Sequence, residues 1–305
     1  LADRYAYVPA IGIFIAIVWA GSERIARITE TARSTAVIAA VGACLLAFGV
    51  AAHQQARYWQ DTVSLFERVV EVIPRNPKIR YNLANEYRAR EQHEAAISHY
   101  RIALETDSEA SNARINLANS LKSVGNLDAA VEMYQSVLAL EPNSAVAYNN
   151  LGATLLAQGR IDAAISSLER AIEIEPMRIN AHINLGNALR ERGDTEGASE
   201  QYMNAIQAGS KRSSTWRKLG ESLVAAERQD DAILVYRQAL VLRPDDAQAH
   251  NDLGELHAQR GELGQAIAAY REALRADPQF DNARMNLERA LREAGRPVVD
   301  VNRRR

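Results

Sequence analysis

The pattern of apolar and polar positions divides the chain into two parts. Before residue 54 the sequence holds two long uncharged stretches, whereas from residue 77 onward apolar residues recur at helical spacing between charged ones. The second part repeats itself with a period of 34 residues, and residues 77 to 280 divide into six blocks without insertion or gap. A period of this length predicts stacked helical hairpins, because a single hairpin cannot bury its apolar face alone.

Several positions of the 34-residue block keep one kind of residue. Position 7 is always leucine, position 8 is alanine or glycine, position 20 is always alanine, and position 24 is tyrosine in every block except the third. Small residues at positions 8 and 20 predict a close approach of neighbouring helices. The blocks begin at Pro77, Ser111, Ala145, Ile179, Ser213 and Ala247.

Glycine and proline divide each block into two helices. Four blocks have a mid-block glycine where a left-handed residue would end the first helix, and four close on a proline that cannot continue the second. After residue 280 only the first helix recurs, over 281–295, and Glu288 replaces its usual small residue, which predicts a polar capping helix. The glycines are Gly125, Gly159, Gly193 and Gly261, and the prolines are Pro142, Pro176, Pro244 and Pro278.

These residues match the tetratricopeptide repeat (TPR), and the resemblance covers residues 77 to about 294. It implies an all-α fold, a right-handed superhelical solenoid whose first helices line a concave groove for proteins or extended peptides. We therefore predict a TPR domain of six repeats plus the capping helix over 77–294, followed by a tail over 295–305. Before this domain we predict a connecting helix over 55–76 and, from the uncharged stretches, a membrane region over 1–54.

The uncharged stretches at 8–20 and 35–52 predict transmembrane helices at about 8–27 and 35–52, the first of them extended beyond its uncharged part to reach the length of a span. The second has 18 residues without a charge, close to the roughly 20 that a span requires. A helix buried in a soluble core is the alternative, but no other segment is apolar enough to surround it. The linker between the stretches carries Arg24, Arg27 and Arg33, which favours a cytoplasmic linker. We expect a multi-pass protein of the inner or plasma membrane with an extracytoplasmic TPR domain.

Composition and motifs exclude several kinds of partner and site. The net charge of -2 gives no general attraction to nucleic acid, so no such partner is expected. Cys44 is the single cysteine, which leaves no disulfide framework or cysteine-based zinc site. His250 and His257 stand about 10 Å apart along one helix, too far to share a metal. Without a P-loop, GxSxG or HExxH motif, we expect no catalytic residue, metal or cofactor in this chain.

Asparagine dominates positions 6 and 9 of the blocks, which lie three residues apart on one face of the first helix. Because its amide both donates and accepts, a ladder of asparagines can hold the backbone of an extended peptide, as in the repeat domain of O-GlcNAc transferases, which this pattern resembles. The alternative is that these asparagines serve contacts between helices, and the sequence leaves both open. The predicted groove residues are Asn82, Asn85, Asn116, Asn119, Asn150, Asn184, Asn187, Lys218 and Asp252.

The groove is predicted to change character along its length. Beyond Ser213 its inner positions carry charges such as Arg217, Lys218 and Asp252, so that end should prefer charged ligands. The two-carboxylate clamp that other TPR proteins use for chaperone C-termini needs lysine and arginine beside its asparagines. Those basic residues are missing at the matching positions.

The start of the chain resembles a second family. The segment DRYAYVPAIGIF at 3–14 and the segment RYWQDTVSLF at 57–66 are similar to segments around the late membrane helices of the transmembrane and TPR-containing protein O-mannosyltransferases. That resemblance implies membrane lipid and a polyprenyl-phosphate sugar as partners, and Arg4 as a contact of the donor phosphate. An interfacial anchor is the alternative role for Arg4.

Two functional hypotheses follow from the sequence. The first is a membrane-anchored TPR scaffold that binds proteins or extended peptides. The alternative is the acceptor-recruiting, C-terminal part of a protein O-glycosyltransferase that uses a lipid-phosphate sugar. The chain begins with Leu1, and we expect it to be a fragment that lacks the catalytic loop of such an enzyme.

Overall fold

A computed structural model of the chain describes residues 42–43, 45–47, 49–50, 61–107, 110–295 and 297. Throughout these ranges the regular structure is α-helix, joined by short turns. The helices are α3 (Thr62–Val72), α4 (Pro77–Ala89), α5 (His93–Thr106), α6 (Ser111–Ser123), α7 (Leu127–Leu140), α8 (Ala145–Ala157), α9 (Ile161–Ile174), α10 (Ile179–Arg192), α11 (Thr195–Gln207), α12 (Ser213–Ala225), α13 (Gln229–Leu242), α14 (Ala247–Gln259), α15 (Leu263–Ala276) and α16 (Asp281–Glu293).

The predicted membrane region falls mostly outside this description. The span at 8–27, Arg4 and the end of the tail lie outside the described residues, and of the span at 35–52 only residues 42–43, 45–47 and 49–50 are described, as helix. In the part of the chain that is described, no helix combines the length and the apolar character needed to cross a membrane.

The connecting helix was predicted over 55–76, and within its described part, 61–76, the helix α3 runs from Thr62 to Val72. Asp61 has an extended backbone, and its carboxylate accepts a hydrogen bond of 3.3 Å from the backbone N–H of Ser64, which caps α3. The helix ends at Val72, and a turn through Pro74 leads to α4. Residues 55–60 lie outside the description.

Each first helix begins at the residue that starts its 34-residue block, from Pro77 in α4 to Asp281 in α16. The turn inside each hairpin uses a left-handed residue at position 15, as predicted for Gly125 (φ 81°) and Gly193 (φ 89°). In the first and fifth repeats the same position is Glu91 and Glu227, each with φ 60°. A left-handed glutamate is strained, and neither of these two positions was predicted to be left-handed.

Packing within a hairpin joins position 24 of the second helix to position 8 of the first. The ring of Tyr202 lies so close to Gly186 that a Cβ built on this glycine would stand 2.7 Å from Tyr202 Cε1. Gly220 and Tyr236 have the same relationship, with a corresponding distance of 2.6 Å. The small residues at position 8 therefore have the role that the sequence predicted, since they admit a buried tyrosine between the two helices.

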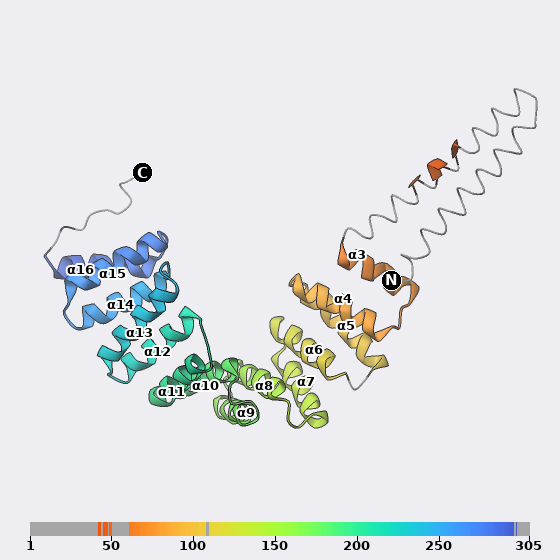
Figure 1. Cartoon of the computed structure of the whole chain (residues 1–305), viewed down its shortest axis with the longest axis horizontal. Helices are drawn as coiled ribbons and strands as arrows, with labels where there is room; N and C mark the ends of the chain where they lie inside the picture. Colours follow the sequence, from red (N-terminus) through yellow and green to blue (C-terminus); the bar gives the residue numbers. More distant parts are fainter. Residues whose placement is uncertain are drawn as a thin grey trace, which may run out of the picture.

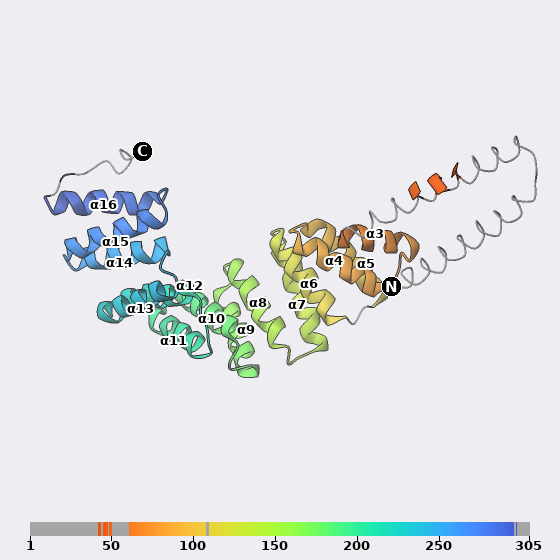
Figure 2. The same cartoon turned by 45° about the horizontal axis from the view of Figure 1, so that its top comes forward.

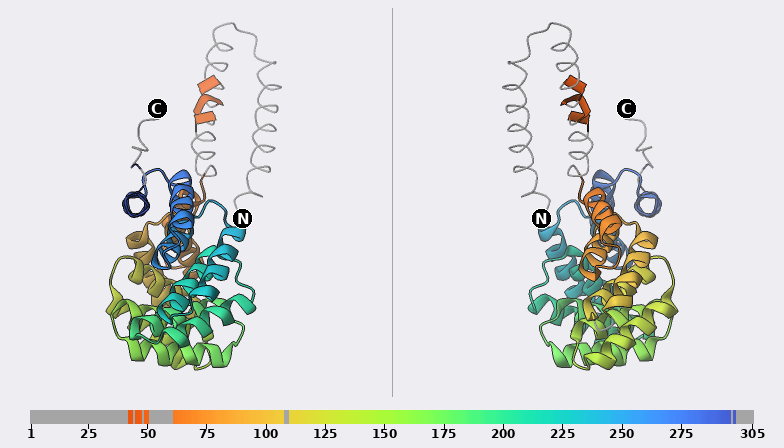
Figure 3. Two further views of the ribbon diagram at one scale, coloured as in Figure 1. Left: turned by 90° about the vertical axis from the view of Figure 1, so that its left-hand side faces the viewer. Right: turned by 90° about the vertical axis from the view of Figure 1, so that its right-hand side faces the viewer.

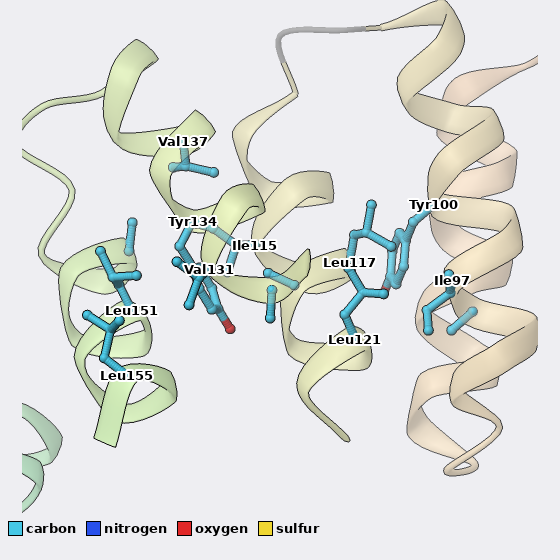
Figure 4. Close-up of a cluster of buried hydrophobic side chains, with 14 of the residues drawn as sticks. Ile97, Tyr100, Ile115, Leu117, Leu121, Val131, Tyr134, Val137, Leu151 and Leu155 are labelled. Carbon is cyan, nitrogen blue, oxygen red and sulfur yellow. The ribbon is translucent and has the colours of Figure 1, made fainter. Parts of the chain in front are cut away.

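Packing between hairpins places the second helix of one repeat on the first helix of the next. In the core of the first three repeats, Ile97 and Tyr100 of α5 point toward Leu117 and Leu121 of α6 (Figure 4). The side chain at position 4 of the next first helix also closes the turn. His182 Nε2 lies 2.8 Å and His250 Nε2 2.9 Å from the carbonyl oxygens of Pro176 and Pro244.

The hairpins follow one another along an arc, with α3 at one end and α16 at the other (Figure 1). Tilting the view shows that they also rotate, because α14 to α16 lie across the picture whereas α8 and α9 stand more nearly upright (Figure 2). From either end of the molecule, the first and last repeats lie toward one side and the middle repeats toward the other (Figure 3). These features describe a superhelical solenoid.

Candidate binding groove

The first helices of the repeats, α4 to α16 in even numbers, form the inner side of the arc, as α6, α8 and α10 show in its middle (Figure 1). Consecutive first helices contact one another directly, for example α4 with α6 and α8 with α10. Helices that approach across a repeat in this way lie at the smaller radius of a curved solenoid. The predicted groove residues all stand on these helices.

Three asparagines at position 9 each join two repeats. Tyr100 Oη donates to Asn85 Oδ1 at 2.5 Å within the first repeat, and Asn116 Nδ2 of the second repeat donates to the same oxygen at 3.0 Å. Two equivalent groups are Tyr134–Asn119–Asn150, with distances of 2.6 and 3.4 Å, and Tyr202–Asn187–Lys218, with distances of 2.9 and 2.6 Å. The ladder is therefore also a set of contacts between helices, one of the two roles the sequence left open.

The third repeat is joined to the fourth by a different side chain. Its position 9 is Ala153 and its position 24 is Leu168, so neither the hydroxyl nor its acceptor is present. The amide of Asn149, at position 5, takes over the contact between repeats: Asn149 Nδ2 donates to Asn150 Oδ1 at 3.0 Å and Asn184 Nδ2 donates to Asn149 Oδ1 at 2.9 Å.

Asn82 differs from the other predicted groove residues. Its side chain is exposed, and in the described part of the chain it has no hydrogen-bond partner, whereas Asn119 and Asn187 are half-buried and bonded. Asn82 is thus free for a ligand without any rearrangement of the protein. Peptide binding along this row of asparagines stays a prediction.

The charged end of the row is an ion-pair network. Arg190 Nη1 lies 2.6 Å from Glu221 Oε2, and Arg217 contacts both Glu221 and Asp252, the latter at 3.4 Å. Burial raises the pKa of Asp252 to about 6, although Gln248 Nε2, at 2.7 Å, and Arg217 act in the opposite direction. Most of the charge predicted beyond Ser213 is therefore compensated within the protein.

A pocket of about 590 Å³ opens on the inner side and spans four repeats. Lys122 of α6 and Lys218 of α12 lie at its borders along the chain, and between them stand Leu156 of α8 with Asn187 and Arg190 of α10. The sequence prediction missed Lys122, Leu156 and Arg190. One signal was present: all three occupy position 12 of their blocks, one helical turn beyond position 9 and on the same face.

Imidazole and carboxylate groups of the described residues do not gather into a metal site. Within the described ranges, no three side chains of His, Cys, Asp or Glu lie close enough together to hold an ion. His257 is buried and its Nδ1 lies 2.5 Å from Glu262 Oε2, while His250 is half-buried against the Pro244 carbonyl.

Sequence models of one family match four stretches of the chain. The tetratricopeptide repeat matches residues 77–109, 109–176, 155–219 and 217–279. The matches run on from one another, and together they cover well over half of the 305 residues. The chain belongs to the tetratricopeptide-repeat family. The hairpins, the small residue at position 8 and the buried tyrosine at position 24 are how this chain builds that repeat.

Two curated proteins share part of this sequence. The protein O-mannosyl-transferase TMTC1 of Mus musculus is 33% identical over 104 residues, and its Homo sapiens counterpart is 32% identical over 104 residues. The matched stretch is 34% of this TPR chain, but only 11% and 12% of the lengths of the two relatives. The chain therefore corresponds to a small part of these proteins.

Solved structures share the fold. The Cut9–Hcn1 tetramer of the APC/C gives a TM-score of 0.61 at 22% identity, covering 74% of this chain and 45% of the other. PilF of Pseudomonas aeruginosa gives 0.60 at 20% identity, covering 71% and 97%. YrrB, a TPR protein with an unusual peptide-binding site, gives 0.52 at 22% identity, covering 60% and 95%. At these identities the likeness concerns the all-helical TPR solenoid.

Proposed function

We propose that this chain is a membrane-anchored TPR scaffold that binds proteins or extended peptide segments along the inner side of its solenoid. One observation carries the proposal: side chains from four consecutive repeats, from Lys122 to Lys218, line a single pocket. A ligand that contacts all of them must itself be extended. Membership of the TPR family and the likeness to YrrB, a peptide-binding TPR protein, support the same function.

A groove-blocking variant tests the binding. Ala157 is an exposed lining residue of the pocket on α8, and Gln135 is an exposed residue of α7, a second helix. The full chain, purified in detergent, should retain members of an immobilised library of unstructured peptides. Ala157→Trp should abolish this retention and Gln135→Trp should not. Equal retention by both variants and the parent would place the binding elsewhere.

The anchor is proposed from the uncharged apolar stretches at 8–20 and 35–52. The extracytoplasmic position of the repeats is proposed from Arg24, Arg27 and Arg33, which lie between the two stretches. Single cysteines introduced at exposed positions of the solenoid, in a Cys44→Ala background, should react in intact cells with a thiol reagent that cannot cross the membrane. Labelling that requires broken cells would contradict the proposed orientation.

A second candidate function rests on the similarity to the two O-mannosyl-transferases. Under this proposal the solenoid recruits acceptor proteins for a glycosyltransferase that uses a polyprenyl-phosphate sugar, and Arg4 contacts the donor phosphate. The detergent-purified chain should then retain radiolabelled polyprenyl-phosphate mannose. Arg4→Ala should lower this retention and Arg303→Ala in the tail should not. Retention no greater than that of empty micelles would remove the donor lipid from the proposal.

A further inference from the structure

The pocket between α6 and α12 is chemically divided along the solenoid axis. Its middle, in the third repeat, is apolar and includes Leu156 and Ile161. Cationic side chains border it on both sides, Lys122 from the second repeat and Lys218 from the fifth, with Arg190 from the fourth. An extended ligand that follows the groove therefore meets a cation, then an apolar surface, then a second cation.

The two lysines differ from the arginine in how their charge is compensated. Arg190 is paired with Glu221 at 2.6 Å. In contrast, across the described ranges of the chain no carboxylate lies within 4 Å of the ammonium group of Lys122 or Lys218. Lys218 Nζ instead donates to the neutral Asn187 Oδ1 at 2.6 Å.

Both lysines are also partly removed from water. Each is half-buried, and burial lowers the pKa of both Lys122 and Lys218. For Lys218 the neighbouring Arg190 lowers the pKa further, while Glu221, which raises it, is itself held by Arg190 and Arg217. A half-buried cation without a counter-charge costs stability, and an anionic ligand group would remove that cost.

We propose that this pocket binds an extended peptide segment in which an apolar side chain is flanked on both sides by acidic side chains. The apolar side chain packs on Leu156, and the flanking carboxylates pair with Lys122 and Lys218. Glu191, the acidic lining residue, is exposed and can turn toward solvent. This inference rests on the proposed groove function and adds a sequence preference to it.

Three labelled peptides of equal length test the preference in fluorescence anisotropy with the full chain in detergent. At the centre of an otherwise identical Ser-rich sequence they carry Asp-Ser-Leu-Ser-Asp, Asn-Ser-Leu-Ser-Asn or Asp-Ser-Ala-Ser-Asp, in which every second side chain lies on the same face of an extended peptide. These peptides are called Asp-Leu-Asp, Asn-Leu-Asn and Asp-Ala-Asp after the side chains on that face. Two half-buried ion pairs should make Asp-Leu-Asp bind at least about tenfold more tightly than Asn-Leu-Asn. This advantage should shrink when the salt concentration is raised from about 50 to about 500 mM, because the Debye screening length shortens. The loss of the apolar contact should weaken Asp-Ala-Asp several-fold.

Lysine variants assign the effect to the pocket. In the variant Lys122→Gln and in Lys218→Gln, the advantage of Asp-Leu-Asp over Asn-Leu-Asn should fall about threefold or more. Lys211→Gln, an equal change of charge at an exposed site outside the pocket, should preserve it. Helical circular dichroism confirms that each variant is folded.

The two levels of the proposal fail in different ways. If the peptides bind with equal affinity and the lysine variants change nothing, the acidic preference is wrong while the groove function stands. If no peptide binds, and Ala157→Trp has no effect on library retention, the groove function is wrong as well.

Discussion

Asn187 Oδ1 accepts two hydrogen bonds, one of 2.9 Å from the Tyr202 hydroxyl of its own repeat and one of 2.6 Å from Lys218 of the next. One side-chain oxygen on the inner face therefore ties α10 to both α11 and α12. Asn187, which was predicted to contact a ligand, therefore also holds two repeats together. Loss of binding on its mutation has two explanations, which stability measurements separate.

Asn187→Ala should lower the free energy of unfolding by about 1–3 kcal/mol, because the buried Tyr202 hydroxyl loses its acceptor. Tyr202→Phe removes the donor instead, and adding it to Asn187→Ala should cost less than the two single changes together. Urea unfolding followed by circular dichroism measures this. Asn180→Ala, an exposed change on the same helix, is the control, and a loss as large there would refute the joint role.

Asn82→Ala should change the free energy of unfolding by less than about 0.5 kcal/mol, because its exposed side chain contributes no hydrogen bond within the described protein. If the asparagine row binds a peptide backbone, the same change should weaken retention of library peptides. This makes Asn82 the cleanest test of the predicted ladder. Unchanged retention would restrict the binding groove to the repeats after the first.

Gly186→Ala should destabilise the chain by about 1–3 kcal/mol, because the added methyl overlaps the buried ring of Tyr202. Gly264→Ala is the matched control on α15, where nothing lies within 4 Å of the added Cβ. That change should stabilise the helix by about 0.5–1 kcal/mol. Thermal unfolding compares the two, and shifts of the same sign would show that position 8 does not set the spacing of the helices.

Glu227→Gly should stabilise the chain by about 1 kcal/mol, because position 227 has φ 60° and glycine adopts this conformation without steric cost. Gly159→Ala, at the same position of the third repeat with φ 73°, should act in the opposite direction. Urea midpoints of the two variants and the parent give the comparison. A destabilising Glu227→Gly would mean that the glutamate side chain makes up for its backbone strain.

Asp252→Asn should stabilise the chain at pH 7 and have little effect at pH 4. The pKa of Asp252 in the folded chain is about 6, above its ordinary 3.8, so the folded state holds the proton more tightly than the unfolded state does. The group therefore destabilises the fold increasingly as the pH rises from 4 to 6, by at most about 3 kcal/mol. Urea unfolding at a series of pH values should show this trend lost in Asp252→Asn and kept in Asp245→Asn, an exposed aspartate.

Much of the repeat architecture was predictable because a repeat contacts only its neighbours. Leu83 and Leu117 stand at the same position of their blocks and are both buried, since identical local sequences meet identical surroundings. The exceptions are positions where one repeat departs from the others. Glu91 and Glu227 take the left-handed turn that glycine takes elsewhere, because the two helices on either side impose the turn whatever residue occupies it.

The groove was predictable as a face but not as a set of contacts. Helical spacing placed Asn85 and Asn187 on the inner side, yet it could not show that their oxygens are already occupied by Tyr100 and Tyr202. A hint lay in the sequence, because the block with Ala153 at position 9 is also the one with Leu168 at position 24. That pairing indicates a contact between the two positions.

The sequence by itself determined the period, the two helices of each repeat and the residues that face inward, because all three follow from local spacing and from turn residues. Only the tertiary structure decided which inward polar groups are satisfied and which are left for a ligand. Lys122 and Arg190 share position 12 of their blocks, but among the described residues a carboxylate from the next repeat pairs with Arg190 and none pairs with Lys122. Such a difference depends on side chains that meet across repeats, and no single repeat contains it.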